Sequence, residues 1–106
     1  MKFDHVGLIT DQKKDNESWV EATRVWVTDY SKHPYRVEWL RYEPDSPVKG
    51  PVREKSHIAF EVDDLEEASG GLKVLLEPFE AVGGARVGFY EYDDGTVVEF
   101  IEYPKK

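Results

Sequence analysis

Residues 4–9 read Asp-His-Val-Gly-Leu-Ile, and residues 56–61 repeat this pattern as Ser-His-Ile-Ala-Phe-Glu. Two further pairs of segments match in the same order along the chain: VEWLRY at 37–42 with VEFIEY at 98–103, and RVWVTDY at 24–30 with RVGFYEY at 86–92. Three matches in one order indicate that the second half of the chain duplicates the first. We therefore expect two similar modules related by a pseudo-twofold axis.

The two copies differ in length. His5 and His57 are 52 positions apart, whereas Arg24 and Arg86 are 62 positions apart. The second copy therefore has about ten additional residues between its first two matched segments, which is roughly the length of one strand with its turn. This difference predicts that the first module has lost one strand.

We expect a single domain over residues 1–106, with a first module at about 1–48 and a complete β-α-β-β-β module at about 54–104. Residues 44–51, with three prolines and a glycine, link the two. The expected fold class is α+β: two βαβββ-type modules, the first shortened, form a curved, partly open barrel-like sheet around a site on its concave face.

Strands are predicted at seven segments rich in β-branched and aromatic residues: 3–10, 24–30, 35–43, 57–62, 73–76, 86–92 and 96–103. Helical pattern is confined to two short stretches. The stronger one covers 65–68, where Asp63 and Asp64 can cap the start. The weaker one covers 17–23, with Trp19 and Val20 as its apolar face.

The amino-acid composition limits the metal ligands and the binding partners that the protein can have. The chain has no cysteine, so a bound metal would need nitrogen and oxygen ligands. Its 22 acidic and 14 basic residues give a net charge of −8, which repels nucleic acid and anionic membranes. No window approaches the roughly 18 apolar residues of a membrane span, and no basic leader precedes an apolar run. We therefore expect a cytoplasmic protein that binds neither nucleic acid nor membrane.

The duplication brings four potential metal ligands together. A pseudo-twofold axis places equivalent strands side by side, so His5 should face His57 and Glu38 should face Glu99. Strand alternation agrees, because it points Glu99 to the concave face while its two neighbours are buried. Imidazole nitrogen and carboxylate oxygen suit zinc, nickel, cobalt, manganese or iron. We predict a divalent metal ion held by these four residues.

Such a site could act as a Lewis acid on a carbonyl compound and stabilise the charge that appears when the adjacent carbon loses a proton. Glu38 and Glu99 are the candidate catalytic bases, because both lie beside the predicted metal. Alternatives remain open at this point. The histidines could be structural, Glu38 could pair with Arg36 instead, and both glutamates could only coordinate.

Three stretches carry a family resemblance: Phe3–Gly7, His57–Leu65 and Val97–Phe100. They resemble the vicinal-oxygen-chelate superfamily of glyoxalases, bleomycin-resistance proteins and extradiol dioxygenases, over nearly the whole chain. Residues 43–48 and 83–87 look most like methylmalonyl-CoA epimerases. The resemblance implies that His5, His57 and Glu99 bind the metal, and that the position of Glu38 is a ligand in glyoxalases.

The resulting hypothesis is a glyoxalase-like, metal-dependent isomerase, epimerase or lyase that acts on a small carbonyl compound through an enolate-like intermediate. The alternative is a metal-free binding protein of the same fold that sequesters a small molecule. A domain that keeps the fold without a working site is the third reading. We also expect a homodimer, because a first module without one strand would leave an exposed sheet edge.

Overall fold

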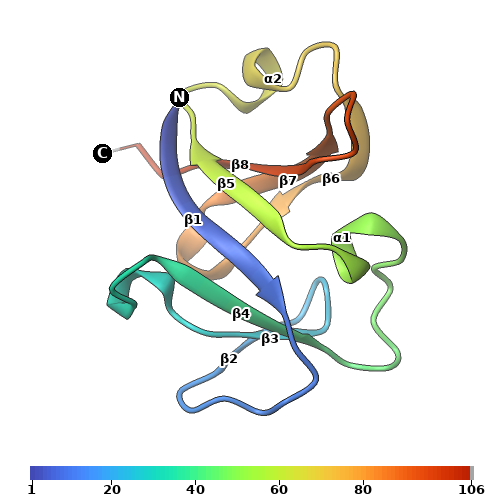
Figure 1. Cartoon of the computed structure of the whole chain (residues 1–106). Helices are drawn as coiled ribbons and strands as arrows, with labels where there is room; N and C mark the ends of the chain where they lie inside the picture. Colours follow the sequence, from blue (N-terminus) through green and yellow to red (C-terminus); the bar gives the residue numbers. More distant parts are fainter. Residues whose placement is uncertain (106) are drawn as a thin grey trace.

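Two four-stranded units join edge to edge in one curled, mixed sheet (Figure 1). The computed structural model describes residues 1–105. The first unit contains β1 (Lys2–Ile9), β2 (Ser18–Val20), β3 (Val25–Val27) and β4 (Val37–Tyr42), with the 3-10 helix η1 (Tyr30–Lys32). The second contains β5 (His57–Glu61), β6 (Lys73–Glu80), β7 (Arg86–Glu91) and β8 (Val97–Glu102), with α2 (Leu65–Ala68) and η2 (Val82–Gly84). Helix α1 (Pro51–Glu54) lies between the two units.

The strand order β2-β3-β4-β1-β5-β8-β7-β6 reads symmetrically from its centre. Strands β1 and β5 pair antiparallel there, and each has its own fourth strand as a parallel neighbour, β4 for β1 and β8 for β5. The expected α+β fold with a curved sheet is therefore confirmed. The symmetry places two pairs of equivalent strands, β1 with β5 and β4 with β8, at the centre of the sheet.

The first unit has no α-helix and keeps all four strands, so the expectation of a lost strand was wrong. The additional length of the second unit lies in α2 and in β6, which has eight residues where β2 has three. The physical reason is visible in the connections. Residues 10–17 are almost wholly polar, whereas residues 62–72 contain the Asp64 cap and the apolar Leu65 that a packed helix needs.

The helix expected at residues 17–23 was also wrong. Ser18–Val20 forms β2, which pairs antiparallel with β3. Trp19 lies directly opposite Trp26, with ring centroids 4.9 Å apart. A helix at residues 17–23 would lose this cross-strand contact. Cross-strand aromatic contacts of this kind stabilise a sheet, and here they override a weak helical pattern.

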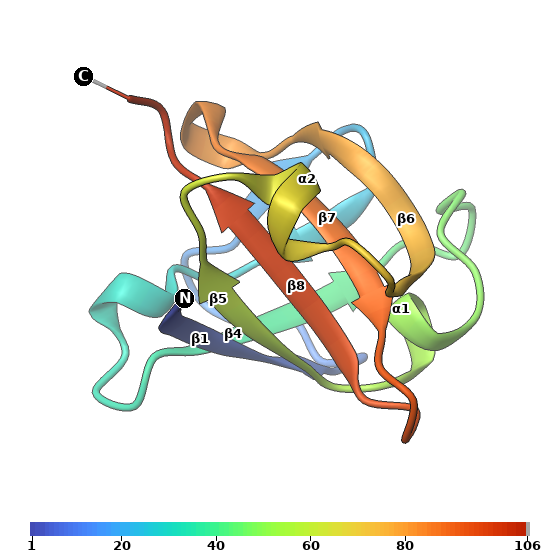
Figure 2. The same cartoon turned by 90° about the horizontal axis from the view of Figure 1, so that it is seen from above.

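Helix α2 covers the convex face of the second unit, lying over β8 (Figure 2). Leu65 is completely buried there against Tyr90 and Phe100, as strand alternation predicted for Phe100. Ile58 on β5 is not covered by this helix and is 38% exposed. With four residues, α2 extends only about 6 Å and leaves that end of β5 uncovered.

The concave face holds the second cluster of buried side chains, which includes Val87, Phe89 and Ile101, and it borders a cavity. Within residues 1–105, no helix is both long and apolar enough to cross a membrane. The opposite faces of the sheet therefore have different functions: the convex face is packed by α2, and the concave face presents the site.

Candidate metal site

The four predicted ligands come from the four central strands: His5 from β1, Glu38 from β4, His57 from β5 and Glu99 from β8. Their register places them around two small residues. Gly7 lies between Glu38 and His57, and Ala59 lies between His5 and Glu99. Gly7 and Ala59 are equivalent in the duplication, so each unit supplies one small residue beside the ligands of both units.

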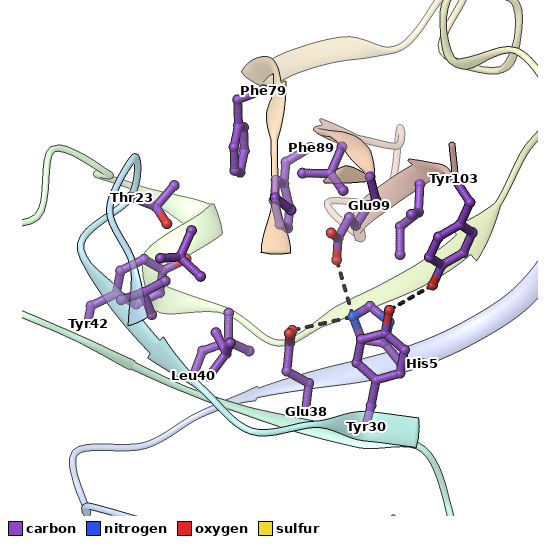
Figure 3. Close-up of a pocket in the computed structure, with 17 residues that line it drawn as sticks. His5, Thr23, Tyr30, Glu38, Leu40, Tyr42, Phe79, Phe89, Glu99 and Tyr103 are labelled. Atoms are coloured by element: carbon purple, nitrogen blue, oxygen red, sulfur yellow. Dashed lines mark hydrogen bonds and ion pairs between the residues drawn. The ribbon is translucent and has the colours of Figure 1, made fainter. Parts of the chain in front are cut away.

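The four side chains converge at one place on the concave face (Figure 3 shows three of them). One ligand atom from each lies within 4.8 Å of the others. His5 Nε2 is 3.3 Å from Glu38 Oε1 and 3.3 Å from Glu99 Oε1. His57 Nε2 is 3.0 Å from Glu99 Oε1 and 3.9 Å from Glu38 Oε1. Glu38 thus makes the longest of these contacts.

Burial makes this cluster unusual. His5, His57 and Glu99 are 1%, 2% and 6% exposed, and the Glu38 side chain is 14% exposed. Yet His5 Nε2, His57 Nε2 and Glu99 Oε1 have no hydrogen-bond partner among the described residues, although they face one another. Buried polar atoms are nearly always partnered, so three partnerless atoms around one point fit a ligand that they share. Two imidazoles and two carboxylates suit a divalent metal ion.

His5 is held by a hydrogen-bond chain that sequence reasoning missed. Its Nδ1 lies 2.7 Å from Asp4 Oδ2, and the Tyr103 hydroxyl donates to Asp4 Oδ1 at 2.9 Å. The Tyr30 hydroxyl lies 2.7 Å from that of Tyr103, and the Tyr30 ring stacks on His5 with centroids 3.9 Å apart. With Nδ1 bound to an ionised Asp4, Nε2 is the nitrogen that faces Glu38 and Glu99.

A β-bulge explains how two consecutive residues reach the same interior. Along β1, Phe3 pairs with Phe60 and His5 pairs with Ala59, so Asp4 is the extra residue of the bulge. A bulge re-aims a side chain that strict alternation would send to the other face. Asp4 is consequently buried next to His5, where it also accepts a hydrogen bond from Arg36 through its backbone carbonyl.

His57 is positioned by shape. A Cβ atom added to Gly7 would overlap the His57 ring, so glycine is required for the imidazole to lie where it does. The edge of Phe89 packs against the ring at a centroid distance of 5.0 Å. Unlike His5, His57 has no hydrogen-bond partner for Nδ1 within residues 1–105.

The charges in the cluster are strongly coupled. Burial alone would lower the pKa of His5, but the hydrogen bond to Asp4 and the nearby carboxylates of Glu38 and Glu99 outweigh this effect and raise the pKa to about 11. Burial alone would raise the pKa of Glu99, but the close approach of the two imidazoles, at 3.3 and 3.0 Å, outweighs this and holds the pKa at about 2. Burial raises the pKa of Glu38. Without a metal, His5 therefore carries a proton between two carboxylates.

The cluster borders a cavity of about 110 Å³ between the two units. His5, Glu38 and Glu99 form its main polar part together with Tyr30 and Tyr103, and Thr23 and Tyr42 add further hydroxyl groups to the lining. Its walls are mainly apolar and come from both units: Val25, Val27, Leu40, Phe79, Val87, Phe89 and Ile101. The arrangement therefore places a group of potential metal-ligating side chains beside a small cavity.

Among the aromatic residues, Tyr30 lines the cavity beside His5. Tyr90 is buried on the convex face, and Tyr92 is more than half exposed. The Trp26 indole donates to Glu43, and Trp26 does not line the cavity. Tyr103 was missed, although its position in the duplication pairs it with Tyr42, which also lines the cavity.

Comparison with solved structures gives the class of fold. The chain has the glyoxalase-like fold, as the sequence resemblance predicted. It is similar to methylmalonyl-CoA epimerase from Mycobacterium tuberculosis, with a TM-score of 0.64 and 15% identity over 98% of this chain and 89% of that one. An uncharacterised protein from Methanosarcina mazei gives a TM-score of 0.62 and 16% identity over 100% and 97%. No family model and no curated protein matches the sequence.

Proposed function

We propose that this protein is a metal-dependent isomerase, epimerase or lyase acting on a small carbonyl compound. The observation that carries the proposal is the buried cluster of His5, Glu38, His57 and Glu99, whose partnerless atoms face one another beside a cavity. The similarity in fold to an epimerase supports the reaction class. A structural role alone would leave three buried polar atoms unsatisfied, which is unfavourable.

The donor set fits a divalent ion in number and charge. Two carboxylates balance two positive charges, and two neutral imidazoles complete four ligands, so positions for substrate oxygens remain open. A bound ion would polarise the carbonyl and favour loss of a proton from the adjacent carbon. The chain itself must then supply the base that accepts this proton.

Glu38 is the base that we favour, with Glu99 as the second candidate. Both line the cavity, so both can reach a bound molecule. Glu38 is the more loosely held, since it is the more exposed of the two and lies 3.9 Å from His57 Nε2, where Glu99 lies at 3.0 Å. A carboxylate that can leave its partners is better suited to take a proton and return it than one held closely between two imidazoles.

Two measurements test this function. Protein purified without chelator should contain one equivalent of a divalent metal by elemental analysis. Metal-loaded protein should then catalyse exchange of solvent deuterium into the carbon next to the carbonyl of a substrate. Glu38→Gln should lose most of this exchange while it keeps the metal, and Glu43→Gln, outside the cavity, is the matched control. Wild-type exchange by both Glu38→Gln and Glu99→Gln would exclude both glutamates as the base.

The apolar walls of the cavity favour one alternative, a binding protein that holds a small molecule without metal. The elemental analysis separates the two functions, because sequestration predicts tight ligand binding by protein without metal.

The homodimer stays a prediction, although no strand is lost from the first unit. The sheet has free edges at β2 and β6, and light scattering at micromolar concentration measures whether either one pairs.

A further inference from the structure

The cavity beside the cluster restricts what the substrate can be. Its volume of about 110 Å³ compares with roughly 300–1,000 Å³ for pockets that bind drug-sized ligands. A ligand that enters completely must therefore be compact, with only a few non-hydrogen atoms. The coenzyme A moiety of a thioester would have to remain outside.

The charge of the lining adds a second restriction. Glu38 and Glu99 supply negative charge, and no lysine or arginine lines the cavity in the described part of the chain. A divalent ion would only neutralise the two glutamates. An anionic group on the substrate would thus lie unpaired among apolar walls, where a buried charge without a partner is strongly unfavourable.

Cations near the cavity are already engaged or face elsewhere. The adjoining cleft contains Arg36, and it shares Val27, Tyr30, Glu38 and Tyr103 with the cavity. That guanidinium donates to the Asp4 carbonyl and lies 3.7 Å from the Asp4 carboxylate. A separate cleft contains Lys14 and Arg53, but it shares only Tyr42 with the cavity.

The apolar walls of the cavity indicate which chemical groups the substrate has besides its carbonyl group. Val27 and Leu40 line the cavity from the first unit, and Phe79 and Phe89 line it from the second. The charged cluster lies at one side, and the polar groups away from it are the uncharged hydroxyls of Thr23 and Tyr42 (Figure 3). A molecule that satisfies both parts has an oxygen-bearing end toward His5 and Glu99 and an aliphatic or aromatic remainder.

From these restrictions we infer that the substrate is a compact, uncharged carbonyl compound with an apolar remainder, bound whole within the cavity. This inference rests on the proposed function. It excludes carboxylates, phosphates and coenzyme A thioesters as substrates, although the fold is shared with an enzyme whose name contains methylmalonyl-CoA.

A matched trio of probes tests the inference. α-Hydroxyisobutyrate is compared with the hydroxy ketone in which a methyl group replaces one carboxylate oxygen, and with α-hydroxyisobutyryl-CoA. The acid and the ketone have the same number of non-hydrogen atoms and differ in charge. Saturation-transfer NMR and calorimetry on zinc-loaded protein should give a dissociation constant for the ketone at least tenfold below those of the acid and the thioester. Absent or weaker binding of the ketone overturns the inference.

Val27→Phe supplies the second arm, because it fills the cavity from a half-buried position on β3. It should weaken ketone binding at least tenfold at unchanged zinc content and circular dichroism. Val74→Phe, on the exposed side of β6, is the control and should bind as the wild type does. Unchanged ketone binding by Val27→Phe also overturns the inference. Zinc content measured on the same samples keeps the two proposals apart, since absence of zinc contradicts the proposed function and a preference for the acid contradicts only the substrate class.

Discussion

The two histidines occupy equivalent positions in the duplication, yet the chain holds them in different ways. His5 is held by charge and hydrogen bonds, through Asp4, Tyr103 and the stacked ring of Tyr30. His57 is held by shape, between the bare backbone of Gly7 and the edge of Phe89. The two units therefore supply equivalent ligand residues but position them through different contacts. This difference predicts that substitutions around the two histidines fail for different physical reasons.

The largest effect is expected at Gly7. Gly7→Ala places a methyl group on the His57 ring, which must move away from Glu99. Displacing a ligand should weaken zinc binding by more than about 100-fold, beyond the roughly 10–100-fold loss typical of outer-shell changes. Overpacking should also lower the free energy of unfolding by about 1–3 kcal/mol. Competition with a chromogenic chelator and urea denaturation measure the two effects.

Gly70→Ala is the matched control for this substitution, because a Cβ atom at Gly70 makes only an ordinary contact with the Glu67 carbonyl at 3.5 Å. It should bind zinc with wild-type affinity. Equal zinc affinities for Gly7→Ala and Gly70→Ala would show that shape does not position His57.

The second effect concerns the charge that supports His5. Asp4→Asn keeps the size of the side chain but removes the carboxylate that fixes Nδ1. Zinc affinity should fall by about 10–100-fold, as for other outer-shell carboxylates. Asp45→Asn, in an exposed ion pair with Arg24, is the control and should leave the affinity unchanged. An Asp4→Asn variant with wild-type affinity would remove the distinction between the two histidines.

The contrast between Asp4 and Gly7 also shows what a sequence can reveal. Duplication and strand alternation were sufficient to predict the curved sheet and the meeting of the four ligands, because both depend on local pattern. Asp4 escaped this reasoning, since alternation sends it to the opposite face from His5. Only the bulge against β5 brings it inward, and a bulge depends on the register between strands distant in sequence.

The absence of an α-helix from the first unit was not predicted, for a related reason. A difference in length between two copies does not say which element was lost, and a three-residue strand such as β2 has too little pattern to be recognised alone. Its pairing of Trp19 with Trp26 appears only when the strands are already assembled. The role of Gly7 likewise depends on His57 being its cross-strand partner.

A third prediction uses the charge state of His5 in metal-free protein. Its pKa is about 11 in the folded state, compared with an ordinary value of 6.5. The folded state therefore holds a proton that the unfolded state releases above pH 6.5, so the associated stability is complete below that pH and is lost as the pH rises toward 11. Between pH 7 and 9 the free energy of unfolding should fall by up to about 1.4 kcal/mol per pH unit.

Urea denaturation of chelator-treated protein at several pH values measures this slope. His5→Gln should abolish it, whereas His33→Gln, on the loop between η1 and β4, should preserve it. A wild-type stability independent of pH between 7 and 9 would contradict a protonated His5.

The smallest effect is expected at the outer end of the hydrogen-bond chain. Tyr103→Phe removes the hydroxyl that donates to Asp4 at 2.9 Å and leaves the ring in place. One hydrogen bond contributes about 1 kcal/mol, so zinc affinity should fall by roughly fivefold. Because this hydroxyl acts on His5 only through Asp4, the substitution should have little further effect in an Asp4→Asn background, and a double-mutant cycle on zinc affinity measures the coupling.

Tyr35→Phe, on an exposed loop, is the control and should leave the zinc affinity unchanged. Additive effects of Tyr103→Phe and Asp4→Asn would mean that Tyr103 acts on the site by another route, most directly through its contact with Tyr30. Coupled effects, with zinc affinity sensitive to Asp4 and Tyr103 on the His5 side and to Gly7 on the His57 side, would establish that two equivalent ligands are supported by charge in one unit and by shape in the other.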